Sequence, residues 1–239
     1  MASPYGIEIT ESCAACDRRS PSFFCTLDTS SLHHFDSIRF PALYPKGALL
    51  FVEGQTPRGV FLLCCGRVKL LTSSGAARVL ITDIAEAGEV LGLSAALAGH
   101  PYEVTAVTLE ACQVNFIKRE EFLRFLEEHG GAGLRVARQL SDTYRRAFEQ
   151  VRLLGLSTSA AEKLARLLME WCERQGRETE RGMSLKLTLT HEEMGQLISA
   201  SRETVTRLLG EFKEGGMIEI RGATLVVRDR PALEALTSP

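Results

Sequence analysis

The stretch from residue 190 to residue 222 constrains the fold more than any other part of the sequence. Thr190 and Ser201 each carry a hydroxyl that can cap a helix, and apolar residues follow both at helical spacing. The second helix is expected from about Arg202 to Phe212. Two short helices joined by a tight turn form a helix-turn-helix. The residues expected to face inward are Met194, Leu197, Ile198, Val205, Leu208, Leu209 and Phe212.

Polar side chains occupy the outward face of the second helix. A recognition helix that enters a major groove presents the residues at its start to base edges. Arginine donates two hydrogen bonds to guanine, and glutamate accepts one from the amino group of cytosine. An acidic residue between arginines favours base readout over general affinity for phosphates, although a solvated helix face is the alternative interpretation. The expected DNA-binding residues are Thr190, Ser201, Arg202, Glu203, Thr206 and Arg207.

The second helix resembles the DNA-binding signature of the CRP/FNR regulators, the family of cyclic-AMP receptors and fumarate-nitrate-reduction regulators. The resemblance rests on residues 201–205 and 207–209, and residues 216–227 are similar to the two-stranded wing of that family. The face of two arginines and one glutamate is similar to the cyclic-AMP-receptor branch. This resemblance implies a homodimer that binds a GTGA-like palindrome in double-stranded DNA. RNA polymerase is a further implied partner if the protein activates transcription.

Composition indicates an ordinary globular protein of one large or two modest domains. Hydrophobic residues make up 45% of the 239 residues and charged residues 24%. No apolar run approaches the roughly 20 residues of a membrane span, and no export signal is recognised. We therefore expect a cytoplasmic protein without a membrane partner. From residue 155 onward, 12 Lys and Arg face 13 Asp and Glu, so DNA affinity is expected to require two modest patches contributed by a dimer.

Seven cysteines without an export signal point to metal binding, redox sensing or burial. Cys13 and Cys16 form a C-x-x-C pair that places two thiolates on one side of a turn, and Cys25 can supply a third ligand. The family resemblance implies Cys112 as the fourth, where the oxygen-sensing branch has its distal cluster ligand. Four cysteines in this order resemble a [4Fe–4S] sensor site, with a longer interval between the second and third than is usual there.

Two other interpretations of these cysteines stay open. Zinc would use the same four thiolates, and a reversible disulfide would use only Cys13 and Cys16. Burial is the expected role of the remaining cysteines, which are Cys64, Cys65 and Cys172.

Residues from about 37 to 116 predict short strands separated by glycines, which favours a hairpin-rich antiparallel barrel. The pattern around Gly47, Gly54 and Gly66 is similar to the double-stranded β-helix, or jelly roll, of the cyclic-nucleotide-binding fold. The expected strands are 48–52, 59–63, 67–71 and 78–81.

Cyclic AMP is not expected as the effector of this barrel. Nucleotide-binding members of the family carry a glutamate for the ribose and an arginine for the cyclic phosphate. Leu93 occupies the glutamate position here, and no arginine occurs between Arg78 and Lys118. A phosphodiester without a cation would be poorly stabilised in such a site. A surface loop is the expected place of His100, Tyr102 and Glu103.

A regular apolar seam lies on the long helix expected to end near residue 154. Its members recur at alternating steps of three and four, which is the heptad spacing of a coiled coil. We expect parallel dimerisation, which would place two recognition helices about one turn of duplex apart. The seam residues are Ala137, Leu140, Tyr144, Ala147, Val151 and Leu154.

The sequence thus predicts an α+β protein with a jelly-roll sensor, a long dimerisation helix and a C-terminal winged helix-turn-helix. No His–Cys or paired-carboxylate constellation suggests an enzyme, although a non-DNA signalling module and a thiol or iron–sulfur enzyme are kept as alternatives. As a hypothesis, oxidation at the cysteines alters the dimer seam and so the spacing of the recognition helices. The expected domains are 1–30 with the cysteines, 31–117 as the sensor, 118–154 with a break at 129–133 before the dimer helix, and 155–239 for DNA binding. Within the last, we expect a helix at 159–173, a loop at 174–182 and a strand at 185–189.

Overall fold

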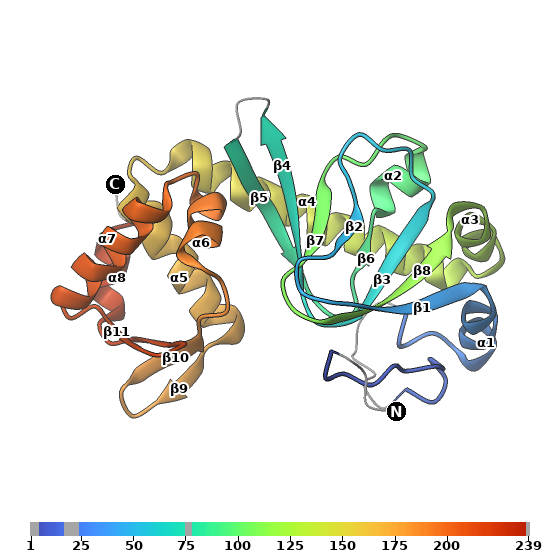
Figure 1. Ribbon diagram of the computed structural model, residues 1–239, viewed down its shortest axis with the longest axis horizontal. Coiled ribbons are helices and arrows are strands. Elements are labelled where there is room, and N and C mark those ends of the chain that lie inside the picture. Colours follow the sequence, from blue (N-terminus) through green and yellow to red (C-terminus); the bar gives the residue numbers. More distant parts are fainter. Residues whose placement is uncertain (1–4, 17–23, 75–77, 238–239) are drawn as a thin grey trace. The chain divides into compact units, whose positions relative to one another are not determined.

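Two compact units make up the chain, Met1–Ala147 and Phe148–Pro239 (Figure 1). The boundary between them lies within one long helix, α4 (Gly130–Leu156). None of the described helices is long and apolar enough to cross a membrane. The residues that the computed structural model describes are 5–16, 24–74 and 78–237.

The first unit is built on two four-stranded antiparallel sheets, which confirms the expected jelly roll. Apolar side chains from both sheets, such as Phe51, Leu63 and Val114, fill the space between them. The strand order of one sheet is β1 (Arg39–Tyr44), β8 (Cys112–Lys118), β3 (Gly59–Cys65) and β6 (Val90–Leu91). The order of the other is β2 (Leu49–Phe51), β7 (Thr105–Thr108), β4 (Val68–Ser74) and β5 (Arg78–Ala85).

Tyr102 belongs to this core, so its expected place in a surface loop is wrong. Its side chain stacks on Phe51 with ring centroids 4.1 Å apart, and its hydroxyl donates a hydrogen bond of 2.7 Å to the carbonyl of Gly59. Stacking buries the ring, and the hydrogen bond satisfies its only polar atom.

Helices cover the outer face of the first sheet and enclose a second apolar cluster. Phe35, Phe122 and Phe125 lie at its centre and are fully buried. The covering helices are α1 (Thr29–Ile38), α2 (Leu93–Ala98), α3 (Arg119–Glu128) and the first turns of α4.

The expected break at residues 129–133 is shorter than the sequence suggested. Only His129 separates α3 from α4, and the glycines that follow are helical. Ala132 and Val136 are buried in the second apolar cluster. Their packing offsets the low helix propensity of glycine in this first turn.

The second unit is a winged helix-turn-helix. Both expected caps are confirmed, because Thr190 and Glu193 form a reciprocal capping box on α6 and the Ser201 hydroxyl accepts from the Thr204 N–H on α7. The helices are α5 (Ala160–Gln175), α6 (His191–Ile198), α7 (Arg202–Glu214) and α8 (Arg230–Ala235). Their sheet has the order β11 (Ile218–Arg221), β12 (Thr224–Val227), β10 (Gly182–Lys186) and β9 (Arg177–Thr179).

Two expectations for this unit are wrong. The stretch 174–182 is not a loop throughout, and the expected strand at 185–189 begins earlier, at Gly182. Gly182 adopts a φ of +117° and lets β9 and β10 pair as a hairpin, although β9 is exposed along its whole length. A strand without buried apolar residues leaves no alternating pattern to detect.

Candidate functional site

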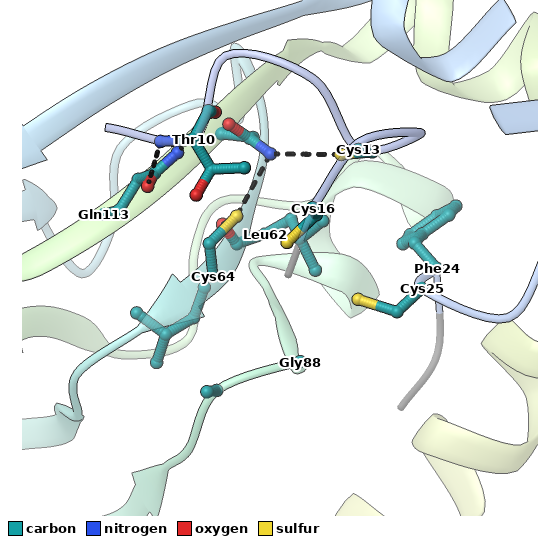
Figure 2. Close-up of a pocket in the computed structure, with 12 residues that line it drawn as sticks. Thr10, Cys13, Cys16, Phe24, Cys25, Leu62, Cys64, Gly88 and Gln113 are labelled. Atoms are coloured by element: carbon teal, nitrogen blue, oxygen red, sulfur yellow. Dashed lines mark hydrogen bonds between the residues drawn. The ribbon is translucent and has the colours of Figure 1, made fainter. Parts of the chain in front are cut away.

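Four cysteines line one pocket in the first unit. Figure 2 shows Cys13, Cys16 and Cys25 of the N-terminal segment together with Cys64 from the end of β3. Thr10, Gly88, Gln113 and Asn115 are among the other lining residues.

Polar side chains of the barrel fasten the cysteine segment at the pocket. Gln113 makes two hydrogen bonds of 2.9 Å with the backbone of Thr10, one as acceptor and one as donor. Asp36 on α1 accepts a bond of 2.9 Å from the N–H of Cys13 and one of 2.8 Å from the Ser12 hydroxyl. Gln113 is fully buried. Side chains far away in the sequence, Asp36 and Gln113, thus hold the segment that carries Cys13 at the pocket.

Asp36 and Arg39 form the charged part of this anchor. Burial opposes the ionised form of Asp36, but hydrogen bonds from Cys13, Ser12 and Arg39 outweigh it and lower the pKa of Asp36 to about 2. Arg39 Nε lies 2.7 Å from Asp36 Oδ1, and Arg39 Nη1 donates to Asn115 Oδ1 at 3.0 Å. The carboxylate is therefore ionised at any physiological pH.

Asn115 connects this anchor to the thiols. Its amide nitrogen donates to the sulfur of Cys64 at 3.1 Å and lies 3.9 Å from the sulfur of Cys13 (Figure 2). On the other side of the pocket, Phe24 precedes Cys25 and stacks on Phe35 with ring centroids 4.6 Å apart. Cys13 and the residue before Cys25 thus both contact the folded first unit, through Asn115 of β8 and Phe35 of α1.

Burial raises the pKa of the Cys13 and Cys64 thiols to about 12, although Arg39 acts in the opposite direction on both. Without a bound cation, both groups are protonated at neutral pH. A protonated thiol is a poor nucleophile, which disfavours spontaneous disulfide formation at these two positions. A metal cation would stabilise both thiolates and displace their protons.

The loop beside the pocket also holds the long helix α4. Ala87 and Gly88 line the pocket, and the two residues that follow them contact α4. Arg146 pairs with Glu89 and with Asp83, both at 2.8 Å. Gln139 makes hydrogen bonds of 3.0 and 2.8 Å with the backbone N–H and carbonyl of Val90.

The expected dimer seam lies largely on an exposed face of α4. Tyr144 is 66% exposed and Val151 is 67% exposed, and Ala137 and Ala147 are also exposed. Leu140 and Leu154 are half-buried, and Leu140 packs against the second apolar cluster of its own unit. Leu134, Phe148 and Leu156 are further exposed apolar residues of α4.

The outward face of α7 carries four of the expected DNA-binding side chains, and the other two, Thr190 and Ser201, are the N-caps of α6 and α7. Buried Val205, Leu208, Leu209 and Phe212 hold the opposite face of the helix. Thr206 donates to the carbonyl of Arg202 at 2.9 Å and lies 2.8 Å from His191 Nδ1, so its hydroxyl is fixed. Hydrogen bonds from its own N–H and from Ser201 lower the pKa of Glu203, which keeps it an acceptor. Arg202, Glu203, Thr206, Arg207, Thr190 and Ser201 are all exposed.

Each of the two units matches a known protein family. The cyclic nucleotide-binding domain family matches residues 42–129, and the Crp-like helix-turn-helix domain family matches residues 162–236. The chain belongs to the CRP/FNR family of transcription regulators. It is accordingly a DNA-binding regulator.

Relatives of this CRP/FNR regulator align over most of its length. The "CRP-like cAMP-activated global transcriptional regulator" of Mycobacterium tuberculosis is 25% identical over 81% of this chain and 86% of its own. The "Fumarate and nitrate reduction regulatory protein" of Salmonella typhimurium is 25% identical over 92% of this chain and 89% of its own. The structure of FixK2 from Bradyrhizobium japonicum shares the fold, with a TM-score of 0.72, 21% identity and coverage of 84% and 98%.

The structure of this CRP/FNR regulator does not bring Cys112 to the cysteine pocket, which corrects the expected ligand set. Its sulfur lies 3.3 Å from the carbonyl oxygen of Glu110, and its side chain is buried between the two sheets. Alternate side chains of a strand point to opposite faces. Cys112 and Val114 therefore face the core, while Gln113 and Asn115 face the pocket.

Sequence reasoning missed Cys64, Gln113 and Asn115. Cys64 was expected to be buried, but it is half-buried and lines the pocket. Cys65 is also only half-buried, whereas the expected burial of Cys172 is confirmed. Two amides at alternate positions of an apolar strand were the available signal, because buried amides require specific partners.

Proposed function

We propose that this protein binds a palindromic DNA site as a cytoplasmic homodimer and that a redox or oxygen signal at its N-terminal cysteines controls the binding. In this proposal the cysteine site holds a [4Fe–4S] cluster. The observation that carries it is the convergence of four thiols, three from the N-terminal segment and one from β3, on one pocket. A set of four cysteine ligands is the donor set of such clusters.

The described sulfurs are not gathered as closely as a single zinc ion requires. Around tetrahedral zinc with Zn–S bonds of about 2.3 Å, neighbouring sulfurs are about 3.8 Å apart. Among the described residues, no three cysteine sulfurs lie within 4.8 Å of one another. A cluster places its iron atoms between the ligands, so its cysteine sulfurs lie farther apart than those around one zinc ion. Bound there, it would supply reversible electron transfer and reactivity toward oxidants.

The contacts of α4 support a route from the cysteine pocket to the dimer seam. Gly88 lines the pocket, Glu89 pairs with Arg146, and Val90 is held by Gln139. A change of packing at the pocket shifts these partners together because they are consecutive in the chain. The exposed seam of α4 then supports transmission to a second copy of the helix.

Cyclic AMP is not part of the proposal. Leu93, which we expect in place of the ribose-binding glutamate of nucleotide-binding family members, is 5% exposed and belongs to the second apolar cluster. An apolar side chain there offers a ribose no hydrogen bond.

Anaerobic purification tests the proposal directly. Iron and acid-labile sulfide are measured together with the visible spectrum, and affinity for a GTGA palindrome is followed by gel shift before and after exposure to air. We expect bound iron and sulfide, bleaching in air and a parallel change in DNA affinity. If zinc were found in place of iron, the cysteines would form a zinc site and the cluster would be excluded. If the protein contained neither iron nor sulfide after anaerobic reconstitution, the cluster would be excluded. DNA binding would then be judged by the gel shift alone.

A further inference from the structure

Two histidines and a glutamate meet where α1, α3 and α4 come together. His34 lies on α1, Glu128 is the last residue of α3, and His129 forms the break before α4. His34 Nδ1 lies 2.9 Å from His129 Nε2 and 3.5 Å from Glu128 Oε2. One ligand atom from each of the three residues lies within 4.8 Å of the other two. This group does not line the cysteine pocket.

The spacing of these atoms matches a tetrahedral metal site. Around an ion with bonds of about 2.0–2.1 Å, neighbouring donor atoms are about 3.3 Å apart. Two of the three separations, 2.9 and 3.5 Å, fall on either side of that value, and the third, between His129 and Glu128, is at most 4.8 Å. Two imidazoles and one carboxylate suit zinc and related divalent transition metals, and three protein ligands leave one position for water.

Hydrogen bonds behind His129 orient its ring as a metal ligand requires. Ser31 Oγ donates to Asp28 Oδ2 at 2.6 Å and lies 2.9 Å from His129 Nδ1. Because the Ser31 hydroxyl donates its hydrogen to Asp28, its oxygen is left to accept from His129 Nδ1–H. The lone pair of His129 is then on Nε2, the nitrogen that faces His34. Partners of this kind fix the tautomer and raise the basicity of a ligating histidine.

The surroundings also hold the site in place. Phe125 packs against both imidazoles, with ring centroids 5.4 Å from His34 and 4.6 Å from His129. Ser31 is only 3% exposed. Glu128 is more open, with 52% of its side chain exposed, which provides an entry path for an ion.

We propose that His34, Glu128 and His129 bind one divalent transition-metal ion of the zinc class. The ion ties α1 to the break that precedes the dimerisation helix, so occupancy stabilises the first unit at the base of α4. It is independent of the ion or cluster held by the cysteines, because the two sites share no residue.

Zinc titration of the full-length protein tests the site by comparing neighbouring histidines. His33 precedes His34 on α1 and is exposed, so His33→Ala is a matched control. We expect wild type and His33→Ala to bind one zinc equivalent more than His34→Ala and His129→Ala in calorimetry. Zinc bound by the cysteines contributes equally to all four. Equal stoichiometry and affinity in all four proteins would overturn the proposal.

Glu128→Gln is a second variant, and it is expected to fold because the Glu128 side chain is exposed. Glu127→Gln, at the neighbouring exposed position, is the control. Loss of this ligand is expected to weaken zinc binding at the site by at least about tenfold. An unchanged affinity would contradict a role for Glu128 as ligand. Iron content and cobalt–thiolate absorption at the cysteine site are expected to be unaltered in His34→Ala, which separates this test from that of the cluster.

Discussion

Cys64 is the residue on which the cysteine site depends most directly, because it is the one thiol contributed by the barrel. Cys64→Ser is expected to lose most of the bound iron, since three thiolates leave one iron without a protein ligand. Iron and acid-labile sulfide per chain, measured under anaerobic conditions, check this expectation.

Two other cysteines serve as controls for that variant. Cys65 is adjacent in sequence and lies outside the pocket, and Cys112 is buried between the sheets. Cys65→Ser and Cys112→Ser are expected to keep wild-type iron. Loss of iron in Cys112→Ser, with retention in Cys64→Ser, would restore the ligand set that the family resemblance implied.

The raised thiol pKa values also predict how the stability of the metal-free protein depends on pH. Burial raises the pKa of Cys13 and Cys64 to about 12 in the folded state, against about 8.5 for an exposed thiol. The unfolded chain therefore loses these protons first. The stabilising contribution is complete below about pH 8.5 and is lost as pH rises toward 12. Urea unfolding is expected to show that the free energy of unfolding declines between pH 7 and pH 10.5. In the Cys13→Ser/Cys64→Ser protein this decline is expected to be shallower.

Part of this site was predictable from the sequence and part was not. The C-x-x-C pair identifies Cys13 and Cys16 because its spacing is local. Cys64 depends on the register of β3 against β8, which shifts between Leu63 and Cys65. A bulge of this kind changes the direction in which a side chain points, and sequence periodicity does not reveal it.

At the scale of elements, Arg146 is the main ionic link between α4 and the barrel. It pairs with Asp83 and Glu89, and all three are only partly exposed. Arg146→Gln is expected to keep the iron content but to remove most of the response of DNA affinity to air, because α4 loses its link to the loop beside the pocket. Gel shifts before and after oxidation measure this response.

Arg145→Gln is the matched control for this coupling. Arg145 is the preceding residue on α4, is exposed, and pairs with Asp142 of the same helix at 3.9 Å. A full response in Arg145→Gln together with a lost response in Arg146→Gln would support the route. A full response in both variants would exclude Arg146 from it.

The exposed seam of α4 makes a separate prediction about assembly. Val151 is 67% exposed in the single chain and occupies a core position of the expected coiled coil. Val151→Asp is expected to weaken the dimer by at least about 2 kcal/mol, roughly thirtyfold in dissociation constant, because a charge would be buried there. Sedimentation over a range of concentrations measures the change. Arg152→Glu, one residue outside the seam, is expected to remain dimeric, and an unchanged Val151→Asp dimer would contradict the seam.

Helices were easier to predict than strands for a physical reason. The caps at Thr190 and Ser201 and the apolar face of α7 depend on residues within a few positions of each other. Strands β1 and β9 depend on partners far away or on exposed pairing, so their own residues carry little pattern.

For the whole molecule, charge limits how strongly DNA is held. The net charge is −2, and several arginines of the second unit are paired with acidic neighbours. Arg207 pairs with Glu211, Arg228 with Glu219, and Arg230 with Glu173. Binding DNA must compete with these pairs, so non-specific affinity is expected to be low and specific contacts to matter more.

Arg202 is the cation best placed to supply such a contact. It is exposed in the first turn of α7, and no ion pair involving it is found within the described part of the chain. Arg202→Ala is expected to cost about 1–3 kcal/mol for the preferred site and to relax selectivity at one base pair of each half-site. Binding to a set of palindromes changed at one position at a time measures this selectivity. Lys213→Ala, in the last turn of the same helix, is expected to preserve it. Uniform weakening by Arg202→Ala across all palindromes would instead mean that Arg202 contacts a phosphate, because a phosphate contact carries no base information.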